Sequence, residues 1–388
     1  MTVATTMRVP VAGVCQPRFA AVRRAFERVM NSDTPAGREI GACVSVVLDG
    51  VTVVDLWGGF RDRARTLPWE PDTITCMMSV AKASASVCAH VLIDRGLIDP
   101  EATVASYWPE FGQAGKERMT VRELLSHRGG VLYADAAPAG SLWQAGVVER
   151  ALEAQAPEWV PGTDAAYHSF TYGPLVEGLV RRVSGLTIGQ FFRAEVAAPL
   201  GLDYQIGLTD AEDARCAEFE ETRGTPSRDG IKENPASPLF RAWAPLPKSE
   251  DFNSRDWRRG EFASANGHGN ARAIARLYGC LARGGEIDGV RLLSERTVAD
   301  VTREHWDGMD RMTNRNFRFG AGFMLSCPPM PMGGHRRNFG HMGLGGAVGF
   351  GDPVRRLGFS YCGNRMAPIA DEGPFGGPLV AATYEALA

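Results

Sequence analysis

The sequence predicts an α+β fold in two parts, because strands near both ends of the chain can form one sheet while helices fill the stretch between them. β-rich runs lie near the start and near the end, and the middle carries apolar residues at helical spacing. This order predicts a discontinuous α/β domain, residues 1–78 and 265–388, and a mainly helical domain, residues 79–264. A functional site is expected in the cleft where the two domains meet.

The chain opens with a helix and two strands. Apolar residues recur at helical spacing through 17–30, which predicts an amphipathic helix. The runs 42–48 and 51–57 are β-rich, and the dipeptide Asp49-Gly50 joins them. Asp-Gly between two such runs is a strong hairpin signal, because both residues of a tight hairpin turn need positive φ.

The middle of the chain is expected to be helical up to about residue 198. The predicted helices are 79–95, a short helix opened by the capping box of Thr120 and Glu123, 170–183 and 188–198. Residues 203–262 carry many Pro, Arg, Asp and aromatic residues with little periodicity. We expect long irregular segments there, lying over a cleft.

The last part of the chain returns to strands. A helix is predicted at 270–283, where Gly284-Gly285 ends it. The predicted strands are 317–325, 346–351 and 357–362, and a final short helix is predicted at 377–386.

Composition narrows the class of function. The 388 residues include 44% hydrophobic and 22% charged residues, and the net charge is -3. These values fit a globular protein and give no reason to expect nucleic acid or a membrane as a partner. No run approaches the ~18 apolar residues of a membrane span, and the N-terminus lacks a signal-peptide core, so we expect a cytoplasmic protein acting on a small molecule.

Metal and redox chemistry have no sequence support. The eight cysteines include no CxxC pair, and the seven histidines show no HxH or HExxH spacing. We therefore expect free thiols in a reducing compartment, and neither a metal nor a cofactor.

Ser79 and Lys82 form the first chemical motif, Ser79-Val80-Ala81-Lys82. At the start of a helix, residues i and i+3 share a face, so the lysine amine can reach the serine hydroxyl. A serine hydroxyl becomes a nucleophile only when a neighbouring base takes its proton. The pair taken alone fits a capping serine followed by a solvated lysine equally well.

Tyr167 lies just before a predicted helix, where its hydroxyl can project into a cleft. Its unperturbed pKa is roughly 10, and we expect a nearby lysine ammonium to lower that pKa by favouring the phenolate. The third motif is His341-Met342-Gly343-Leu344, in a glycine-rich stretch. Glycines there let the backbone approach a bound acyl group, although they also suit a simple turn.

In order and spacing, these three motifs resemble those of the serine β-lactamase and penicillin-binding protein superfamily. Within it, the chain is most similar to the family VIII carboxylesterases, which look like class C β-lactamases. The stretches that carry the resemblance are MMSVAKASA, MTVRELLSHRGG, WVPGTDAAYHSFTYGPLVEGLVRRVSG, PLGL and FGHMGLGGAVGF. The resemblance implies a β-lactamase/transpeptidase-like fold, with a central antiparallel sheet flanked by helices and an all-helical domain.

The resemblance also implies roles for individual residues. Ser79 would be the nucleophile, Lys82 its partner and Tyr167 the base. The backbone N–H groups of Ser79 and Leu344 would form the oxyanion hole, within a third motif that includes His341 and Gly343. The implied mechanism is two-step acyl transfer through an acyl-Ser79 intermediate, and whether Lys82 or Tyr167 is the base in the first step stays open.

Two departures from the β-lactamase pattern favour esters as substrates. Ser169 stands where that pattern has asparagine, and His341-Met342-Gly343 stands where it has Lys-Thr-Gly. The missing lysine would have paired with the carboxylate of a β-lactam or a peptide. No G-x-S-x-G is present, so a nucleophile elbow of the α/β-hydrolase kind is excluded.

We therefore predict a serine carboxylesterase for small, short-acyl esters, with acyl transfer to alcohols or amines as a side reaction. The alternatives are a β-lactamase, a D-aminopeptidase or a DD-peptidase on the same fold, and a non-catalytic scaffold protein of this fold. The residues expected to line the substrate pocket are Tyr133, Ser169, Phe170 and Trp243.

Overall fold

A nine-stranded antiparallel sheet forms the larger layer of the computed structural model, which describes residues 8–31, 39–366 and 373–388. The strand order is β1-β3-β2-β14-β13-β12-β11-β10-β9. In chain order these strands are β1 (Val11–Cys15), β2 (Gly41–Leu48), β3 (Val51–Gly59), β9 (Trp306–Asp310), β10 (Arg315–Phe319), β11 (Met324–Leu325), β12 (Phe339–Met342), β13 (Val348–Asp352) and β14 (Leu357–Gly363). The predicted α+β fold is confirmed.

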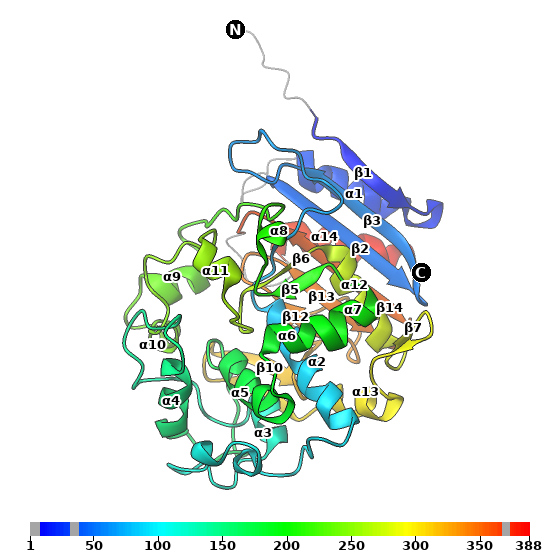
Figure 1. The fold of residues 1–388 in the computed structure, drawn as a ribbon. Coiled ribbons are helices and arrows are strands. Elements are labelled where there is room, and N and C mark those ends of the chain that lie inside the picture. The colour runs from blue at the N-terminus through cyan, green and yellow to red at the C-terminus, as the bar shows by residue number, and fades with distance from the viewer. Residues whose placement is uncertain (1–7, 32–38, 367–372) are drawn as a thin grey trace.

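The two ends of the chain meet in the middle of this sheet. Strand β2 pairs with β14 from Leu48 opposite Leu357 to Ala42 opposite Gly363. The predicted hairpin joins β2 to β3, and its turn residues have positive φ, 49° at Asp49 and 87° at Gly50. Figure 1 shows the blue N-terminal strands beside the orange C-terminal ones.

Helices cover both faces of the sheet. On one face, α1 (Ala20–Asn31) and α14 (Gly373–Glu385) share a hydrophobic cluster with β2 and β14. On the other face, α12 (Ala271–Ala282) belongs to a second, larger cluster that continues into the helical part. The two clusters lie on opposite faces of the sheet because successive side chains of a strand point to opposite sides. Tyr361 belongs to the first cluster and its neighbour Cys362 to the second.

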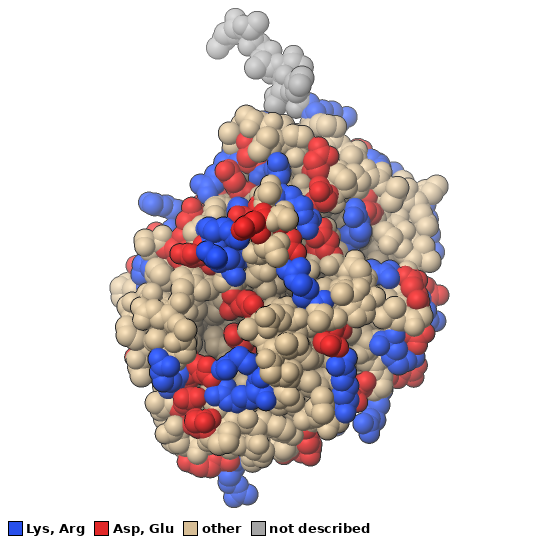
Figure 2. Space-filling view, in the orientation of Figure 1, with Lys and Arg blue, Asp and Glu red and all other residues tan. Residues whose placement is uncertain are grey.

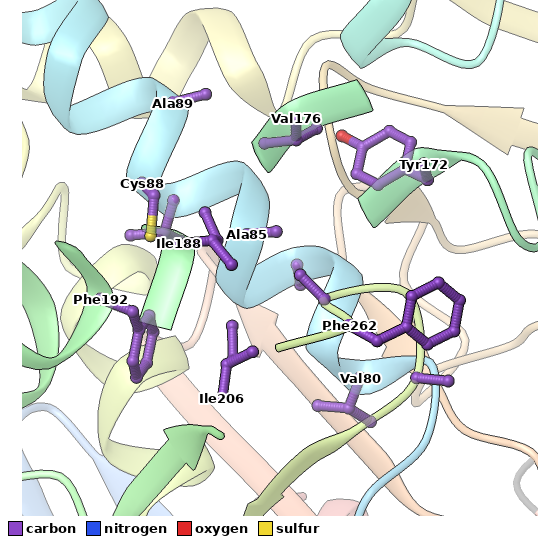
Figure 3. Close-up of a cluster of buried hydrophobic side chains, with 14 of the residues drawn as sticks. Val80, Ala85, Cys88, Ala89, Tyr172, Val176, Ile188, Phe192, Ile206 and Phe262 are labelled. Carbon is purple, nitrogen blue, oxygen red and sulfur yellow. The ribbon is translucent and has the colours of Figure 1, made fainter. Parts of the chain in front are cut away.

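Helix α2 (Val80–Asp94) is the centre of the helical part. Every residue from Val80 to Leu92 is buried, so this helix is covered on all sides. Figure 3 shows side chains of α5, α6 and β5 around it, and the small side chains Ala85 and Ala89 on its surface. The surrounding elements are α3 (Val121–Leu125), α4 (Val147–Ala154), α5 (Tyr172–Ser184), α6 (Ile188–Phe192), a π-helical turn (Arg193–Ala197), α7 (Ala198–Leu200) and β5 (Tyr204–Ile206).

A small sheet fixes the start of α2. Strand β4 (Thr75–Cys76) and β5 both pair with β6 (Gly267–Gly269). Immediately after β4, the Met77 N–H donates to the Gly267 carbonyl at 2.9 Å. Three segments distant in sequence therefore meet at the base of α2.

Residues 203–262 are less irregular than predicted, since they contain several short helices besides β5. These are α8 (Asp210–Asp213), α9 (Pro226–Lys232), α10 (Pro238–Ala242) and α11 (Arg255–Arg259). Each is too short to show a helical period in the sequence. Thr225-Pro226 and Ser237-Pro238 nevertheless place a capping residue type before Pro at the first helical position, which was the available signal.

The remaining elements lie at the edges of the fold. They are 3-10 turns at Pro17–Phe19, Val104–Ser106 and Pro109–Phe111, the hairpin of β7 (Glu286–Ile287) and β8 (Val290–Arg291), and α13 (Glu295–Val301). None of the helices in the described residues is both long and apolar enough to cross a membrane. Figure 2 shows acidic and basic side chains interspersed over the visible face, with no extended area of one sign.

Candidate active site

Ser79 sits at the N-cap of α2, directly after a strained residue. Met78 has a φ of 47°, a left-handed conformation that costs a non-glycine residue about 1–3 kcal/mol. A β-bridge to Asn266 holds Met78 in place. The Ser79 side chain makes no capping hydrogen bond with its own helix, so its hydroxyl is left for chemistry.

Lys82 lies one turn further along α2 and is completely buried. Its Nζ is 3.2 Å from Ser79 Oγ and donates to the Ser264 carbonyl at 2.7 Å. The same Nζ lies 4.8 Å from the centre of the Tyr167 ring. Burial holds the pKa of Lys82 well below its usual value, because an ammonium is poorly solvated there. Burial therefore shifts Lys82 toward its neutral amine, the form that can accept a proton.

Ser264 holds in place the backbone carbonyl that accepts the hydrogen bond from Lys82. Its Oγ accepts the Gly173 N–H at 2.7 Å and donates to the Phe170 carbonyl at 2.5 Å. A Cβ on residue 173 would lie 2.3 Å from the Ser264 nitrogen, so only glycine allows this close approach. The first turn of α5 is thereby joined to the lysine. Sequence reasoning missed Ser264, since no local pattern marks it.

Tyr167 belongs to an extended segment before α5 that is held from both sides. On one side, the Ala166 N–H donates to the His127 carbonyl and the His168 N–H donates to His127 Nδ1, each at 3.1 Å. On the other side, the Tyr167 N–H donates to Asp310 Oδ1 at 2.5 Å. Because the Tyr167 backbone is fixed on both sides, its ring is held close to His127 and His341.

The expected lowering of the Tyr167 pKa is wrong. Burial raises the pKa of Tyr167, and a hydrogen bond from the Ser79 hydroxyl opposes this rise only in part. The nearby Lys82 does not offset it, because the same burial disfavours the ammonium that would have stabilised a phenolate. Burial therefore shifts both groups toward their neutral forms, an amine beside a phenol.

The third motif lies at the end of β12, against the start of α2. A Cβ on Gly343 would lie 2.3 Å from the Met77 carbonyl oxygen, which explains the glycine. Within the residues that the structure describes, neither the Ser79 N–H nor the Leu344 N–H donates to a protein acceptor. Two uncommitted N–H groups beside the nucleophile are what an oxyanion hole requires.

His341 supplies no positive charge to this site at neutral pH. Its Nδ1 pairs with the Met342 carbonyl at 2.7 Å. Burial, together with the charge of Lys82 when that residue is protonated, lowers the pKa of His341 to about 3. The imidazole is therefore neutral, unlike the lysine that the β-lactamase pattern has here.

A cavity of about 730 Å³ opens beside Ser79, a size in the usual range for small-molecule sites. Ser169 and Trp243 line it as predicted, and the Trp243 indole N–H donates to Ser169 Oγ at 2.8 Å. Tyr133 and Phe170 do not line it. The Phe170 ring packs behind Trp243 in the core, and the Tyr133 ring is covered by Arg241 at 3.6 Å.

Most of the cavity wall was not predicted. One side comes from the short helices α9 and α10 and from Phe252, and the other from the β9–β10 turn and the sheet. The apolar lining residues missed from the sequence are Ile231, Leu239, Phe252, Met312, Phe317, Met324 and Met330. Arg315 is the charged side chain on the wall formed by the described residues.

Among the described residues, no cysteine lines the cavity beside Ser79. The eight cysteines are all free thiols. The described residues contain no group of three or more His, Cys, Asp or Glu side chains that could hold a metal ion.

Comparison with known proteins identifies the family of this chain. The model of the beta-lactamase family matches residues 22–374. The chain belongs to the beta-lactamase family. A curated relative in this family, "Esterase/beta-lactamase LipL" of Mycobacterium tuberculosis, is 36% identical over 365 residues, which are 92% of this chain and 83% of that protein.

Solved structures of the family superpose over nearly the whole chain. A family VIII carboxylesterase gives a TM-score of 0.86 at 37% identity, covering 97% of this chain and 100% of its own. A penicillin-binding protein homologue from Caulobacter crescentus gives 0.87 at 36% identity, with coverages of 97% and 100%. The protein is a serine hydrolase of the β-lactamase fold, and the non-catalytic alternative is set aside.

Proposed function

We propose that this member of the beta-lactamase family is a carboxylesterase that acts through an acyl-Ser79 intermediate. The observation that carries the proposal is the partly buried contact of 3.2 Å between Lys82 Nζ and Ser79 Oγ. A lysine that burial shifts toward its neutral amine can take the serine proton, which makes the serine oxygen nucleophilic.

In the first step Ser79 Oγ attacks the ester carbonyl carbon while its proton passes to Lys82. The new oxyanion accepts hydrogen bonds from the Ser79 and Leu344 N–H groups. When the tetrahedral intermediate collapses, the carbon–oxygen bond to the alcohol breaks. The proton then moves from Lys82 through the Tyr167 hydroxyl to the departing oxygen, which leaves as the alcohol.

In the second step water is the nucleophile and Ser79 is the leaving group. It loses a proton to the Lys82–Tyr167 pair and attacks the acyl carbon, and Ser79 leaves with its proton restored. An alcohol or amine that enters the apolar cavity can replace water here, so acyl transfer is part of the proposal.

The substrates we propose are small esters with short acyl chains. The size of the cavity and its largely apolar lining support an uncharged small molecule. A panel of p-nitrophenyl esters from acetate to palmitate tests the chain length, and a maximum at palmitate would contradict it. We also propose a cytoplasmic location, which agrees with the eight free thiols.

Covalent labelling tests the role of Ser79. A phosphonate or sulfonyl fluoride should modify Ser79 alone, and Ser79→Ala should lose several orders of magnitude of esterase activity while keeping its melting temperature. Ser84→Ala is the matched control, because Ser84 lies buried on the same helix. An adduct located on another serine by mass spectrometry would overturn the assignment.

β-Lactam hydrolysis is a second candidate function. It is favoured by the name of the curated relative, which includes β-lactamase, and by Arg315, a cation on the cavity wall. It is disfavoured by the neutral His341 in the third motif. Rates on nitrocefin and p-nitrophenyl butyrate decide between the two: equal catalytic efficiencies would refute a preference for esters.

A further inference from the structure

Asp310 is a buried carboxylate outside all three sequence motifs. It ends strand β9 and has no exposed surface. Its Oδ1 accepts the Tyr167 N–H at 2.5 Å, across 143 residues of sequence. Its Oδ2 accepts the Thr313 N–H at 2.9 Å and also the Thr313 hydroxyl. Oδ1 also accepts the Met312 N–H at 3.4 Å, so the carboxylate as a whole joins two different segments.

These two segments are the ones that meet at the cavity. The first carries Tyr167, and the second is the β9–β10 turn, in which Met312 and Thr313 line the cavity wall. The Asn314 N–H also donates to the Asp310 carbonyl at 2.8 Å, which closes the turn around the same residue. The ion pair of Arg311 with Asp164, at 2.5 Å, is a second link between the same two segments, but it contacts the chain three residues before Tyr167.

We propose that Asp310 is a positioning residue for the esterase reaction, which fixes Tyr167 against Ser79 and couples it to the wall formed by Met312 and Thr313. The proposal rests on the proposed function, because it assumes that Tyr167 handles the proton. Its physical basis is that a shift of about 1 Å in a reacting group can cost about 100-fold in rate.

An alternative explanation is that Asp310 only stabilises the fold. Asp352 offers a matched control, since it is another fully buried aspartate at the end of a strand, β13. It accepts the Val354 and Arg355 N–H groups and the Tyr384 hydroxyl, at 2.9 to 3.0 Å. Asp352 lies outside the cavity wall, so its loss should affect stability without affecting the site.

The experiment compares single-turnover acylation rates of Asp310→Ala, Asp310→Asn and Asp352→Ala with ethyl butyrate, whose poor leaving group needs the proton that Tyr167 delivers. We expect a fall of about 100-fold for Asp310→Ala. Asp310→Asn should lose about tenfold, because its amide oxygen can still accept the Tyr167 N–H while its NH2 group then faces the Thr313 donors and cannot accept from them. Asp352→Ala should match the wild-type rate when rates are normalised to folded protein by circular dichroism.

Thr313→Val tests the link of Asp310 to the cavity wall separately from its link to Tyr167. It removes a donor to Asp310 but leaves the bond to Tyr167, so KM should change while kcat stays within about threefold of wild type. If Asp310→Ala does not fold, the isosteric Asp310→Asn still tests the positioning role of Asp310. An acylation rate within twofold of wild type in either folded Asp310 variant would overturn the proposal. Failure of the proposed function is distinguishable, since wild-type protein itself would then show no acylation.

Discussion

At the scale of single residues, burial sets the chemistry of the site. The same desolvation that lowers the pKa of Lys82 also raises the pKa of Tyr167, because both charged forms are poorly solvated. The sequence alone suggested an ammonium–phenolate pair. The buried site favours the opposite proton arrangement, with a base on the lysine and a proton donor on the tyrosine.

Replacing Lys82 by arginine should be nearly as damaging as replacing it by alanine. A guanidinium stays protonated up to about pH 12, so it cannot take the Ser79 proton. Single-turnover acylation of the two variants measures this directly. If Lys82→Arg keeps a tenth or more of the wild-type rate, the lysine acts only through its charge.

Tyr167→Phe should show a loss that depends on the leaving group. Without the hydroxyl, proton delivery fails, so ethyl esters should slow far more than p-nitrophenyl esters, whose phenolate needs little help to leave. We expect a loss of about 100-fold or more for ethyl butyrate. Equal losses on both ester types would point to Tyr167 as the base that activates Ser79.

At the scale of elements, local patterns predicted well and long-range contacts did not. The hairpin at Asp49-Gly50 and the helix after Ser79 were found because turn chemistry and capping are local. The strands β1 and β9 were missed, since each is a short edge strand without strict alternation. The three candidate catalytic residues each stand in a short sequence motif, whereas Asp310 and Ser264 make contacts across distances in sequence that no local pattern records.

The contact between β12 and the start of α2 gives a prediction at this scale. Gly343→Ala places a Cβ 2.3 Å from the backbone oxygen of Met77, so the strand end and the Leu344 N–H must shift. We expect kcat to fall by about 100-fold with little change in fold. Activity and melting curves measure the two effects.

Gly376→Ala is the control for this substitution. Its Cβ would have ordinary contacts of 3.6 Å with Tyr361 of β14 and Val348 of β13, and alanine is a better helix former than glycine by about 1 kcal/mol. This variant should keep full activity and melt at the same or a higher temperature. An active Gly343→Ala would mean that the third motif does not form part of the oxyanion hole.

At the scale of the whole molecule, the last helix stabilises the sheet from far outside the site. Leu379 of α14 is fully buried in the cluster that α1 and the sheet share. Leu379→Ala should lower the free energy of unfolding by about 2–5 kcal/mol, because it leaves a cavity. The kcat of the protein that remains folded should not change.

Urea unfolding of Leu379→Ala and Leu97→Ala measures this contribution. Leu97 is 53% exposed, so its loss should cost little. Equal midpoints for the two variants would contradict the packing of α14 on the sheet.

The pairing of β2 with β14 also has a consequence for synthesis of the protein on the ribosome. Strand β2 must wait for a partner that is made about 300 residues later, which at about 5–20 residues per second takes tens of seconds. During that time the β2–β3 hairpin has an unpaired edge, and its apolar side chains lack their cover. Because so many of its contacts are non-local, the nascent chain should fold slowly and late, and newly made protein should depend on chaperones that shield exposed strand edges until translation ends.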